Sequence, residues 1–250
     1  MPISSDHGPT DRPASIDGST GRSASGDGSI DPHATELPSD RRPARRVAAL
    51  GLVLGPAAFI AAWAVAGARM PDPYSPVSDA ISRTAAVGSP ERWLMTSGFL
   101  LYAAGSAAGS IALRRTIPGP AWIANAVNSA ATVGVALTPL DHSVGLDGAH
   151  AVTATTGYVS LALTPLLAAQ PLADAGHTAA ARASVGVAAA VGACLIATVG
   201  SNDASGLLQR IGLTVGDAWL IAAGAVLLTG RTLRTAAGAS DPHRRRDRRA

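Results

Sequence analysis

Charge is scarce in this sequence, and what there is gathers at the two ends. Charged residues make up 15% of the 250 residues, whereas about 25% is usual in soluble domains. Residues 47–230 hold only seven arginines and eight acidic residues. A water-soluble domain of that length would have too little charge to cover its surface, so we expect a surface that faces lipid.

Lysine is absent, and Cys194 is the only cysteine. One cysteine forms no intrachain disulfide and leaves the redox compartment open. All twenty basic residues are arginine, which together with the abundant Ala and Gly indicates a GC-rich coding sequence. These arginines cluster beside apolar runs, where they set membrane orientation, so the pI near 9.7 does not predict nucleic-acid binding.

Three regions are predicted. Residues 1–46 are rich in Ser, Asp, Gly and Pro and are expected to form a disordered cytoplasmic tail without the apolar core of a signal peptide. Residues 47–230 are expected to be a membrane domain. Residues 231–250 form a basic cytoplasmic tail, which either only sets topology, the interpretation we favour, or also holds anionic lipid or a partner.

Six apolar runs in the membrane domain approach the roughly 20 residues that cross a bilayer. They are Val47–Ala68, Trp93–Leu113, Ala121–Pro139, Ala149–Ala169, Ala183–Val199 and Ile211–Thr229. The predicted fold class is therefore an all-α polytopic bundle of about six spans. With the N-terminus inside, fourteen arginines lie near the cytoplasmic face and four near the other. This excess predicts a cell-membrane protein with both termini in the cytoplasm.

The long loop after the first span contains the start and stop signals of a short helix. Ser75 and Pro76 resemble an N-cap and a first helical residue, and Gly88 resembles a stop. Asp79 and Arg83 are four residues apart with the acid first, an order that favours an ion pair on a helix. We expect a short helix on the outer membrane surface with its apolar stripe towards the lipid.

The densest polar group precedes the fourth span and contains Asp141, His142, Asp147 and His150. Asp147 is expected to cap that span by accepting the backbone N–H of His150. His and carboxylate suit Zn²⁺, so Asp141, His142 and His150 are weak metal candidates, and Asp141 and His150 are candidate catalytic groups. The alternative is a capped helix and a hydrogen-bonded buried histidine.

Two polar stripes on the third and fourth spans are expected to face each other or a cavity. They are Asn125, Asn128, Ser129 and Thr132 on the third span and Thr153, Gly157, Ser160 and Thr164 on the fourth.

Two further charges lie at or inside the sixth span. Arg210 stands at its outer end, where a carboxylate such as Asp79 or Asp141 is the expected partner. Asp217 lies two turns further in, about 9–10 Å along the axis. A carboxyl group at such a depth indicates a functional site unless a nearby group satisfies it. Small-xxx-small pairs such as Gly51/Gly55 and Gly105/Gly109 indicate close helix packing.

Three motifs in order resemble the prokaryotic membrane family catalogued as domain of unknown function 998. They are Tyr74–Ser82 with Ala86-Val87-Gly88 and Trp93-Leu94-Met95, then Pro139-Leu140-Asp141 with His150, then Gly206–Arg210. The resemblance covers about residues 47–235 and implies a six-helix membrane domain with no established activity. It groups Asp79, Asp141, His150 and Arg210. Within the third motif, Gln209 stands at a position where the family pattern implies a carboxylate.

Three hypotheses about function follow. The first is a binding or transport module whose outward polar pocket, lined by Asp79, Asp141, His150, Arg210 and Asp217, takes a small polar or lipid-headgroup ligand. The second is a membrane hydrolase, with or without a metal ion, acting on lipid-like substrates through Asp141 and His150. The third is a structural or scaffold protein. The sequence does not decide whether the protein is an enzyme, which cofactor it holds or its oligomeric state; its expected partner is the lipid bilayer.

Overall fold

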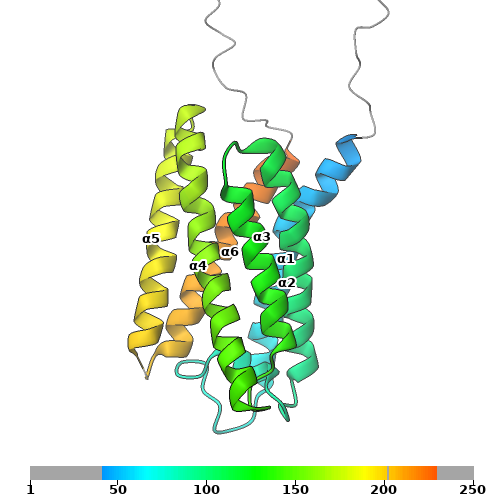
Figure 1. Ribbon diagram of the computed structural model, residues 1–250, viewed down its shortest axis with the longest axis vertical. Helices are drawn as coiled ribbons and strands as arrows, with labels where there is room; N and C mark the ends of the chain where they lie inside the picture. Colours follow the sequence, from blue (N-terminus) through cyan, green and yellow to red (C-terminus); the bar gives the residue numbers. More distant parts are fainter. Residues whose placement is uncertain (1–40, 202, 230–250) are drawn as a thin grey trace, which may run out of the picture. The chain divides into compact units, whose positions relative to one another are not determined.

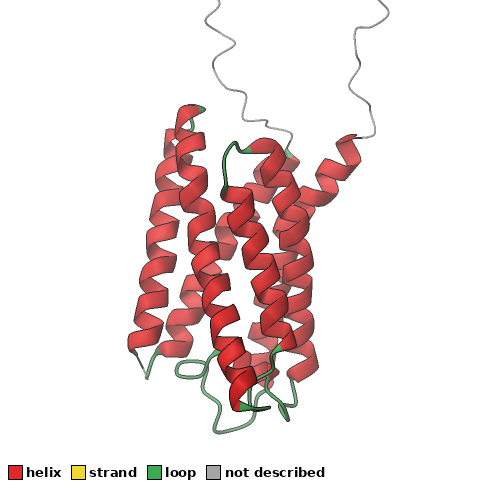
Figure 2. Cartoon of the chain, in the orientation of Figure 1, coloured by secondary structure: helices red, strands yellow, loops and turns green. Residues whose placement is uncertain are grey.

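The computed structural model describes residues 41–201 and 203–229, and throughout these ranges the regular elements are helices (Figure 1, Figure 2). They are α1 (Arg41–Arg69), η1 (Ile81–Ala85, a 3-10 helix), α2 (Arg92–Thr116), α3 (Ala121–Leu137), α4 (Val144–Asp174), α5 (Thr178–Gly200) and α6 (Ser205–Leu228). The predicted all-α class is confirmed. The predicted C-terminal tail and most of the predicted N-terminal tail lie outside the described residues.

Each α-helix packs against the next one in the chain, and α1 packs against α6, so the six helices close into a ring. Neighbouring helices run in opposite directions because most of the connections between them are only a few residues long. The α1–α2, α3–α4 and α5–α6 connections therefore share one end, which we call the loop end (bottom of Figure 1). The start of α1 and the end of α6 lie at the other, terminal end.

Helices α1 and α2 approach so closely that only glycine fits between them. A Cβ atom on Gly51 would lie 2.5 Å from the carbonyl oxygen of Gly105. A Cβ atom on Gly105 would lie 2.7 Å from the Cα atom of Gly55. The predicted small-xxx-small packing thus occurs between these two helices, where it brings the backbones into contact.

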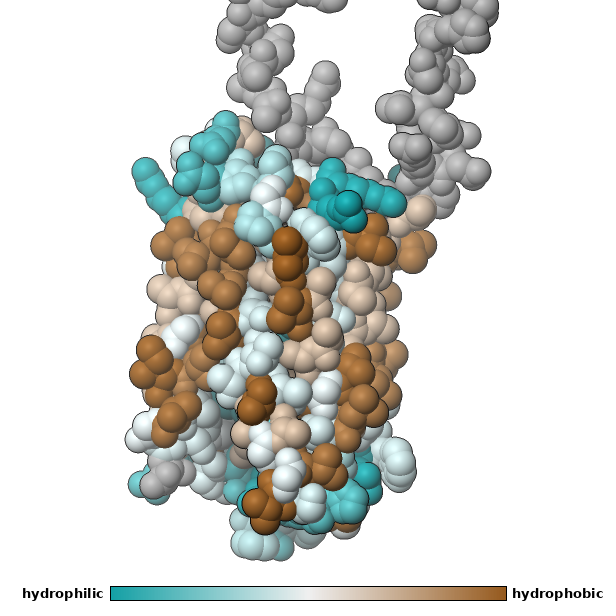
Figure 3. Space-filling model, viewed as in Figure 1, coloured by the Kyte–Doolittle hydropathy of each residue, from teal (hydrophilic) through white to brown (hydrophobic). Residues whose placement is uncertain are grey.

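The surface of the ring suits lipid. Large apolar side chains point outwards from several helices, including Leu54 (60% exposed), Leu101 (57%) and Ile196 (76%). Figure 3 shows apolar residues over the middle of the visible face and hydrophilic residues gathered at its two ends. Such a belt matches a hydrocarbon layer bounded by two polar interfaces.

Five of the helices in the described ranges are long and apolar enough to cross a membrane, namely α1, α2, α4, α5 and α6. Helix α3, the predicted third span, is apolar but has only 17 residues. At 1.5 Å per residue it is about 26 Å long, slightly less than the roughly 30 Å of a hydrocarbon core. The chain is therefore a multi-pass helical membrane protein, and its described residues hold five helices long enough to span a bilayer and one shorter apolar helix.

Candidate functional site

The segment 70–91 between α1 and α2, which we call the long loop, covers the loop end of the ring. The predicted surface helix from Ser75 to Gly88 is wrong in extent and in placement. One helical turn closes where the Asp79 N–H donates to the Ser75 carbonyl at 2.7 Å, and η1 adds five residues. Ile81 and Ala85 of η1 are buried in the protein, so the apolar stripe faces the helix ring instead of the membrane surface.

The long loop does not continue as an α-helix because α6 occupies its carbonyl groups. The four consecutive carbonyls of residues 76–79 all accept hydrogen bonds from the first two turns of α6. The donors are the Leu207 N–H (2.8 Å), the Ser205 hydroxyl (2.7 Å) and the Arg210 guanidinium. Tertiary hydrogen bonds therefore replace the local i→i−4 bonds that an α-helix requires.

Arg210 is the main anchor of this contact and is only 6% exposed. Its Nη1 atom donates to three carbonyl oxygens, those of Pro76 (2.7 Å), Asp79 (2.8 Å) and Gly206 (2.9 Å). Its Nη2 atom donates to the Tyr74 hydroxyl. Burial raises the pKa of Tyr74 above its usual value, so the hydroxyl stays neutral and accepts this bond.

The prediction that Arg210 pairs with a carboxylate is therefore wrong. Arg210 contacts the backbone of Asp79, while the Asp79 carboxylate accepts the Ser75 N–H at 2.7 Å. The expected Asp79–Arg83 pair does not form either. Arg83 instead places one Nη1 atom 2.9 Å from both carboxylate oxygens of Asp141, across the ring on the α3–α4 connection. Without an α-helix here, the i, i+4 geometry that would join Asp79 to Arg83 is missing.

A surface hollow of about 320 Å³ opens beside this ion pair, and we call it the surface depression. Its wall carries Tyr74, Asp79, Arg83 and Asp141. The Val87 N–H also bonds to the Leu140 carbonyl at 2.9 Å, so the long loop is fixed to the α3–α4 connection as well as to α6. Two of the predicted site residues, Asp79 and Asp141, are thus brought together here.

Helix α4 is capped by a different residue from the one predicted. Ser143 is the N-cap, and its hydroxyl accepts the Leu146 N–H at 3.3 Å. The Asp147 carboxylate instead accepts the Asp141 N–H at 3.1 Å. The α4 helix begins at Val144, so Asp147 lies inside its first turn and is past the capping position.

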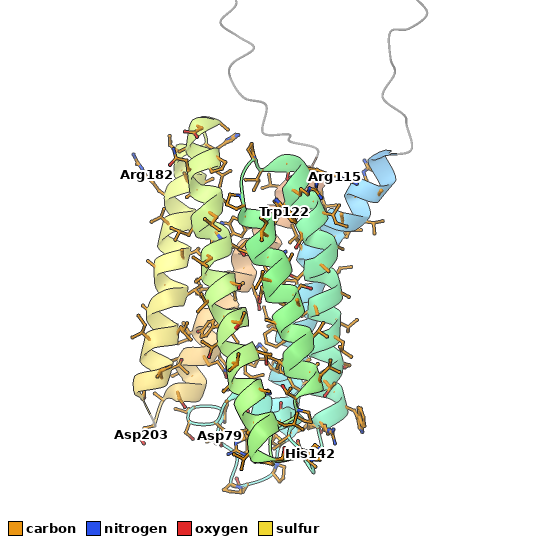
Figure 4. The ribbon with its side chains drawn as sticks, viewed as in Figure 1. Asp79, Arg115, Trp122, His142, Arg182 and Asp203 are labelled. Carbon is orange, nitrogen blue, oxygen red and sulfur yellow. The ribbon has the colours of Figure 1, made fainter. Side chains whose placement is uncertain are left out.

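The weak metal candidates are not assembled into a site. His142 is exposed at the loop end (Figure 4), Asp141 is paired with Arg83, and His150 lies within the ring. In residues 41–201 and 203–229, no group of three or more His, Cys, Asp or Glu side chains is arranged to hold a metal ion.

A second hollow of about 80 Å³ lies among the helices, and we call it the inner cavity. Residues from η1 and from every α-helix except α5 line it. Its polar lining consists of Ser82, Tyr102, Asn128, Thr132, His150, Tyr158, Gln209 and Asp217. Ile81 and Ser82 of η1 border the inner cavity, whereas the adjacent Arg83 borders the surface depression, so η1 stands between the two hollows.

Asp217 is the most unusual residue of the inner cavity. It is 1% exposed, and neither carboxyl oxygen has a hydrogen-bond partner among the described residues. Helix α6 begins at Ser205 rather than at the predicted Ile211. Asp217 therefore lies twelve residues, about 18 Å, from the loop end of α6, about twice as deep as predicted.

The neighbours of Asp217 form a short polar chain. The Asn128 amide donates to the Tyr102 hydroxyl at 2.6 Å. The Tyr102 hydroxyl lies beside the Asp217 carboxyl. Because this hydroxyl already accepts from Asn128, its own proton is available to the neighbouring Asp217 carboxyl or to a ligand in the cavity.

His150 borders the same cavity nearer the loop end. Its Nδ1 atom lies 2.6 Å from the Thr138 carbonyl oxygen. A carbonyl only accepts, so Nδ1 carries the proton, and in the neutral ring Nε2 is left as an acceptor. His150 is thus a hydrogen-bonded buried histidine, as the alternative to a metal or catalytic role predicts. It also lines a polar cavity.

The two predicted polar stripes divide between cavity and packing roles. Asn128, Thr132 and Gly157 line the inner cavity, as the facing-stripe prediction requires. Asn125 instead donates to the Ser106 carbonyl at 2.8 Å, on α2. A 3.6-residue period identifies a polar face but does not divide it between two neighbouring helices.

Sequence reasoning missed the aromatic residues. The chain has only two Phe and three Tyr. Four of them line the inner cavity, namely Phe59, Phe99, Tyr102 and Tyr158. The fifth, Tyr74, lines the surface depression and accepts from Arg210. The only available signal in the sequence was that these five residues are scarce. They are spread over four separate segments, so the sequence does not show that they meet.

Of the five predicted binding residues, two border the surface depression, two border the inner cavity, and Arg210 anchors the long loop. Asp79 and Asp141 border the surface depression, and His150 and Asp217 border the inner cavity. Arg210 holds the long loop that carries Asp79 and Tyr74. A binding role for any of them stays a prediction.

The apolar belt and the five long helices define the class of this chain, a multi-pass α-helical membrane protein. Within that class, residues 53–226 match the family model described as "Protein of unknown function (DUF998)", and the chain belongs to this family. The resemblance found in the three sequence motifs is confirmed. Comparison with curated proteins and with solved structures gave no match.

Proposed function

We propose that the protein is a membrane-embedded binding or transport module whose inner cavity takes a small polar ligand. One observation carries this proposal: a carboxyl group buried to 1% exposure borders a cavity and has no hydrogen-bond partner in the described residues. Burying such a group unsatisfied costs several kcal/mol in apolar surroundings. Acidic residues at this depth in a membrane usually mark a ligand, ion or proton path.

The surface depression is the proposed entrance. It lies at the loop end, beyond η1, and carries charges of both signs from Asp79, Arg83 and Asp141. Since η1 separates it from the inner cavity, entry requires η1 to shift. Such a shift would break the bond from the Ile81 N–H to Gln209 Oε1, which is 2.9 Å long.

The proposed orientation puts the loop end outside the cell. Figure 4 has Arg115 and Arg182 at the terminal end and Asp79, His142 and Asp203 at the loop end. The arginine excess beside the termini favours a cytoplasmic terminal end. We include α3 as a sixth span, because its 17 apolar residues lie between α2 and α4 in the ring and reach the lower limit of spanning length.

Transport or binding is better supported than hydrolysis. The proposed acid–base pair of a hydrolase, Asp141 and His150, is divided between the two hollows, and each group already has a partner, Arg83 for Asp141 and the Thr138 carbonyl for His150. General acid–base chemistry needs both groups within hydrogen-bond reach of one substrate. A scaffold role would require Asp217 to be satisfied by the neighbouring Tyr102 hydroxyl alone, and it does not explain why both groups border a cavity.

The test is ligand-induced stabilisation of the purified full chain in lipid nanodiscs. A panel of small polar solutes and of lipid headgroups is screened by melting temperature against wild type, Asp217→Asn and Asp203→Asn. Asp203 is an exposed acid at the loop end and serves as the matched control. The expected result is that one ligand class stabilises wild type and Asp203→Asn but not Asp217→Asn. If no compound separates Asp217→Asn from the control, the proposal is wrong.

A further inference from the structure

We infer that the ligand of the inner cavity is a small organic cation, a protonated amine or a quaternary ammonium group, with Asp217 as its counter-ion. This inference rests on the proposed function and names the ligand class of the same site. Three properties of the cavity lead to it: the sign of its charge, the hydrogen-bonding capacity left free, and the aromatic residues around it.

Among the described residues that line the cavity, Asp217 is the only acidic one, and it carries a negative charge only when it is ionised. None of these lining residues is an arginine. Arg210, the nearest cation along α6, has its two terminal nitrogens engaged by loop carbonyls and by Tyr74. A buried carboxylate without a partner is stable in a membrane only when it is protonated or when a cation accompanies it. The cavity is therefore suited to a positive ligand and opposed to an anionic one.

The hydrogen-bonding groups left free include several acceptors beside two donors, the Tyr102 hydroxyl and the Gln209 side-chain nitrogen. Both Asp217 oxygens are unpartnered in the described residues. The Asn128 amide nitrogen is used on Tyr102, which leaves the side-chain oxygen of Asn128 to accept. Nδ1 of His150 donates to a carbonyl, which leaves Nε2 as an acceptor. A protonated amine brings N–H donors that satisfy these acceptors, whereas a quaternary ammonium group would be held by charge and by the aromatic rings.

Aromatic side chains supply the remaining attraction. Four of the five Phe and Tyr residues of the chain border this one cavity. Phe59 lies centrally, with its ring centroid 5.7 Å from that of Phe99 and 5.4 Å from that of Tyr102. Ring faces attract ammonium groups within about 6 Å, and enclosures made of several aromatic rings recognise quaternary ammonium ligands.

The size of the inner cavity suits a small organic cation. A volume of 80 Å³ accommodates about five to eight water-sized atoms, the scale of tetramethylammonium or choline. Hard metal cations require about six oxygen ligands. The helix carbonyls in the walls are engaged in backbone bonds, so a metal ion would have to be bound by side-chain oxygens such as those of Asn128, Thr132 and Asp217. The comparison of sodium with choline decides between the two kinds of cation.

The test compares cations with neutral molecules of the same shape. Choline and its neutral isostere 3,3-dimethylbutan-1-ol are titrated against the purified full chain in nanodiscs of phosphatidylglycerol, which has no amine. Methylammonium, tetramethylammonium and sodium chloride complete the series, and melting temperature is the readout. We expect the ammonium compounds to stabilise wild type and Asp203→Asn, and to have no effect on Asp217→Asn.

Other outcomes separate this inference from the function on which it rests. If neutral solutes stabilise wild type as strongly as their cationic partners and depend on Asp217, the cation inference is wrong and the binding function stands. Stabilisation by sodium chloride equal to that by choline also rejects it. If no solute or lipid acts through Asp217, both proposals are rejected.

The source of the ammonium group is decided by changing the lipid. If the group belongs to a lipid headgroup, nanodiscs of phosphatidylethanolamine or phosphatidylcholine stabilise wild type relative to Asp217→Asn, and free choline then adds little. If the group belongs to a free solute, the response to choline is the same in every lipid. Both outcomes support the ammonium class.

The aromatic contribution is tested with Phe99→Leu, which keeps an apolar side chain and removes the ring. The affinity for choline is expected to fall about fivefold, the size of one cation–π contact. The preference for choline over its neutral isostere is compared within each variant, so that a general change in stability cancels. An unchanged preference in Phe99→Leu and in Phe59→Leu would show that the rings play no part.

Discussion

At the scale of single residues, Asp217 is the group whose burial is least favourable for the stability of the fold. A carboxyl buried beside a cavity, with both oxygens unpartnered in the described part of the chain, reduces stability. Groups that lower stability in this way are typical of sites retained for function. Removing the carboxyl should therefore stabilise the empty protein while it abolishes ligand binding.

We expect Asp217→Leu to raise the free energy of unfolding by about 1–3 kcal/mol, because it removes an unsatisfied polar group and fills part of the cavity. The change is measured by unfolding in detergent without added ligand. Asp203→Leu, at the exposed α5–α6 connection, is the control and should change stability by less than about 0.5 kcal/mol. A loss of stability in Asp217→Leu would indicate a structural partner for the carboxyl.

Arg210 is the residue whose shape matters more than its charge. One guanidinium reaches three carbonyl oxygens and the Tyr74 hydroxyl at once. A lysine keeps the charge but has a single nitrogen on a flexible stem. The planar fork of the guanidinium therefore fixes the long loop to α6.

Arg210→Lys is expected to lower the free energy of unfolding by about 2–3 kcal/mol, because charge-assisted bonds to buried carbonyls are lost. Trypsin should also cleave faster after Arg83, which lies on the same loop. The matched control is Arg182→Lys, an exposed arginine at the terminal end. Equal melting and cleavage in the two variants would mean that Arg210 does not anchor the loop.

At the scale of elements, the long loop has two attachments of different strength. Its contact with α6 is buried, whereas its ion pair with the α3–α4 connection is half exposed, at 50% for Arg83 and 52% for Asp141. Exposed ion pairs contribute about 0–1 kcal/mol. The loop should therefore detach first on the side of the surface depression.

Asp141 also has a backbone role, since its φ of 63° lies in the left-handed region. Asn adopts this region more readily than Ala. We expect Asp141→Asn to cost less than about 1 kcal/mol, which measures the ion pair alone. Asp141→Ala should cost about 1 kcal/mol more because of backbone strain. Unfolding measurements on both variants decide this, and equal costs would contradict the strain.

The predicted surface helix illustrates why local sequence signals did not predict the structure of the long loop. Ser75, Pro76 and Gly88 carry ordinary helix signals, and the local sequence supports the Asp79–Arg83 spacing. The carbonyls of residues 76–79 nevertheless bond to α6, more than 120 residues away in sequence. A local pattern does not include these distant donors, so it predicts the local alternative.

At the scale of the whole molecule, the ring has its hollows nearer one end. The surface depression and the long loop lie at the loop end, and the inner cavity extends from there towards Asp217 near the middle of α6. If the loop end faces outwards, the site is reached from outside the cell. Orientation is therefore part of the functional proposal.

Cysteine labelling of intact cells tests the orientation. In a Cys194→Ser background, a membrane-impermeant maleimide should label His142→Cys and Asp203→Cys, which lie at the loop end. Arg182→Cys, at the terminal end, should react only after the cells are permeabilised. The reverse pattern would place the hollows on the cytoplasmic side.

The sequence by itself determined the helical class, the positions of the apolar segments and the family. These properties depend on hydropathy along continuous segments and on ordered motifs, which local sequence contains. Only the tertiary structure decided which polar residues meet. Arg83 pairs with Asp141 and not with Asp79, and Arg210 bonds to carbonyls and not to carboxylates. Four aromatic residues from three helices line the cavity that Asp217 also borders. Such partners are selected by distance and burial across the ring, which no spacing along the chain encodes.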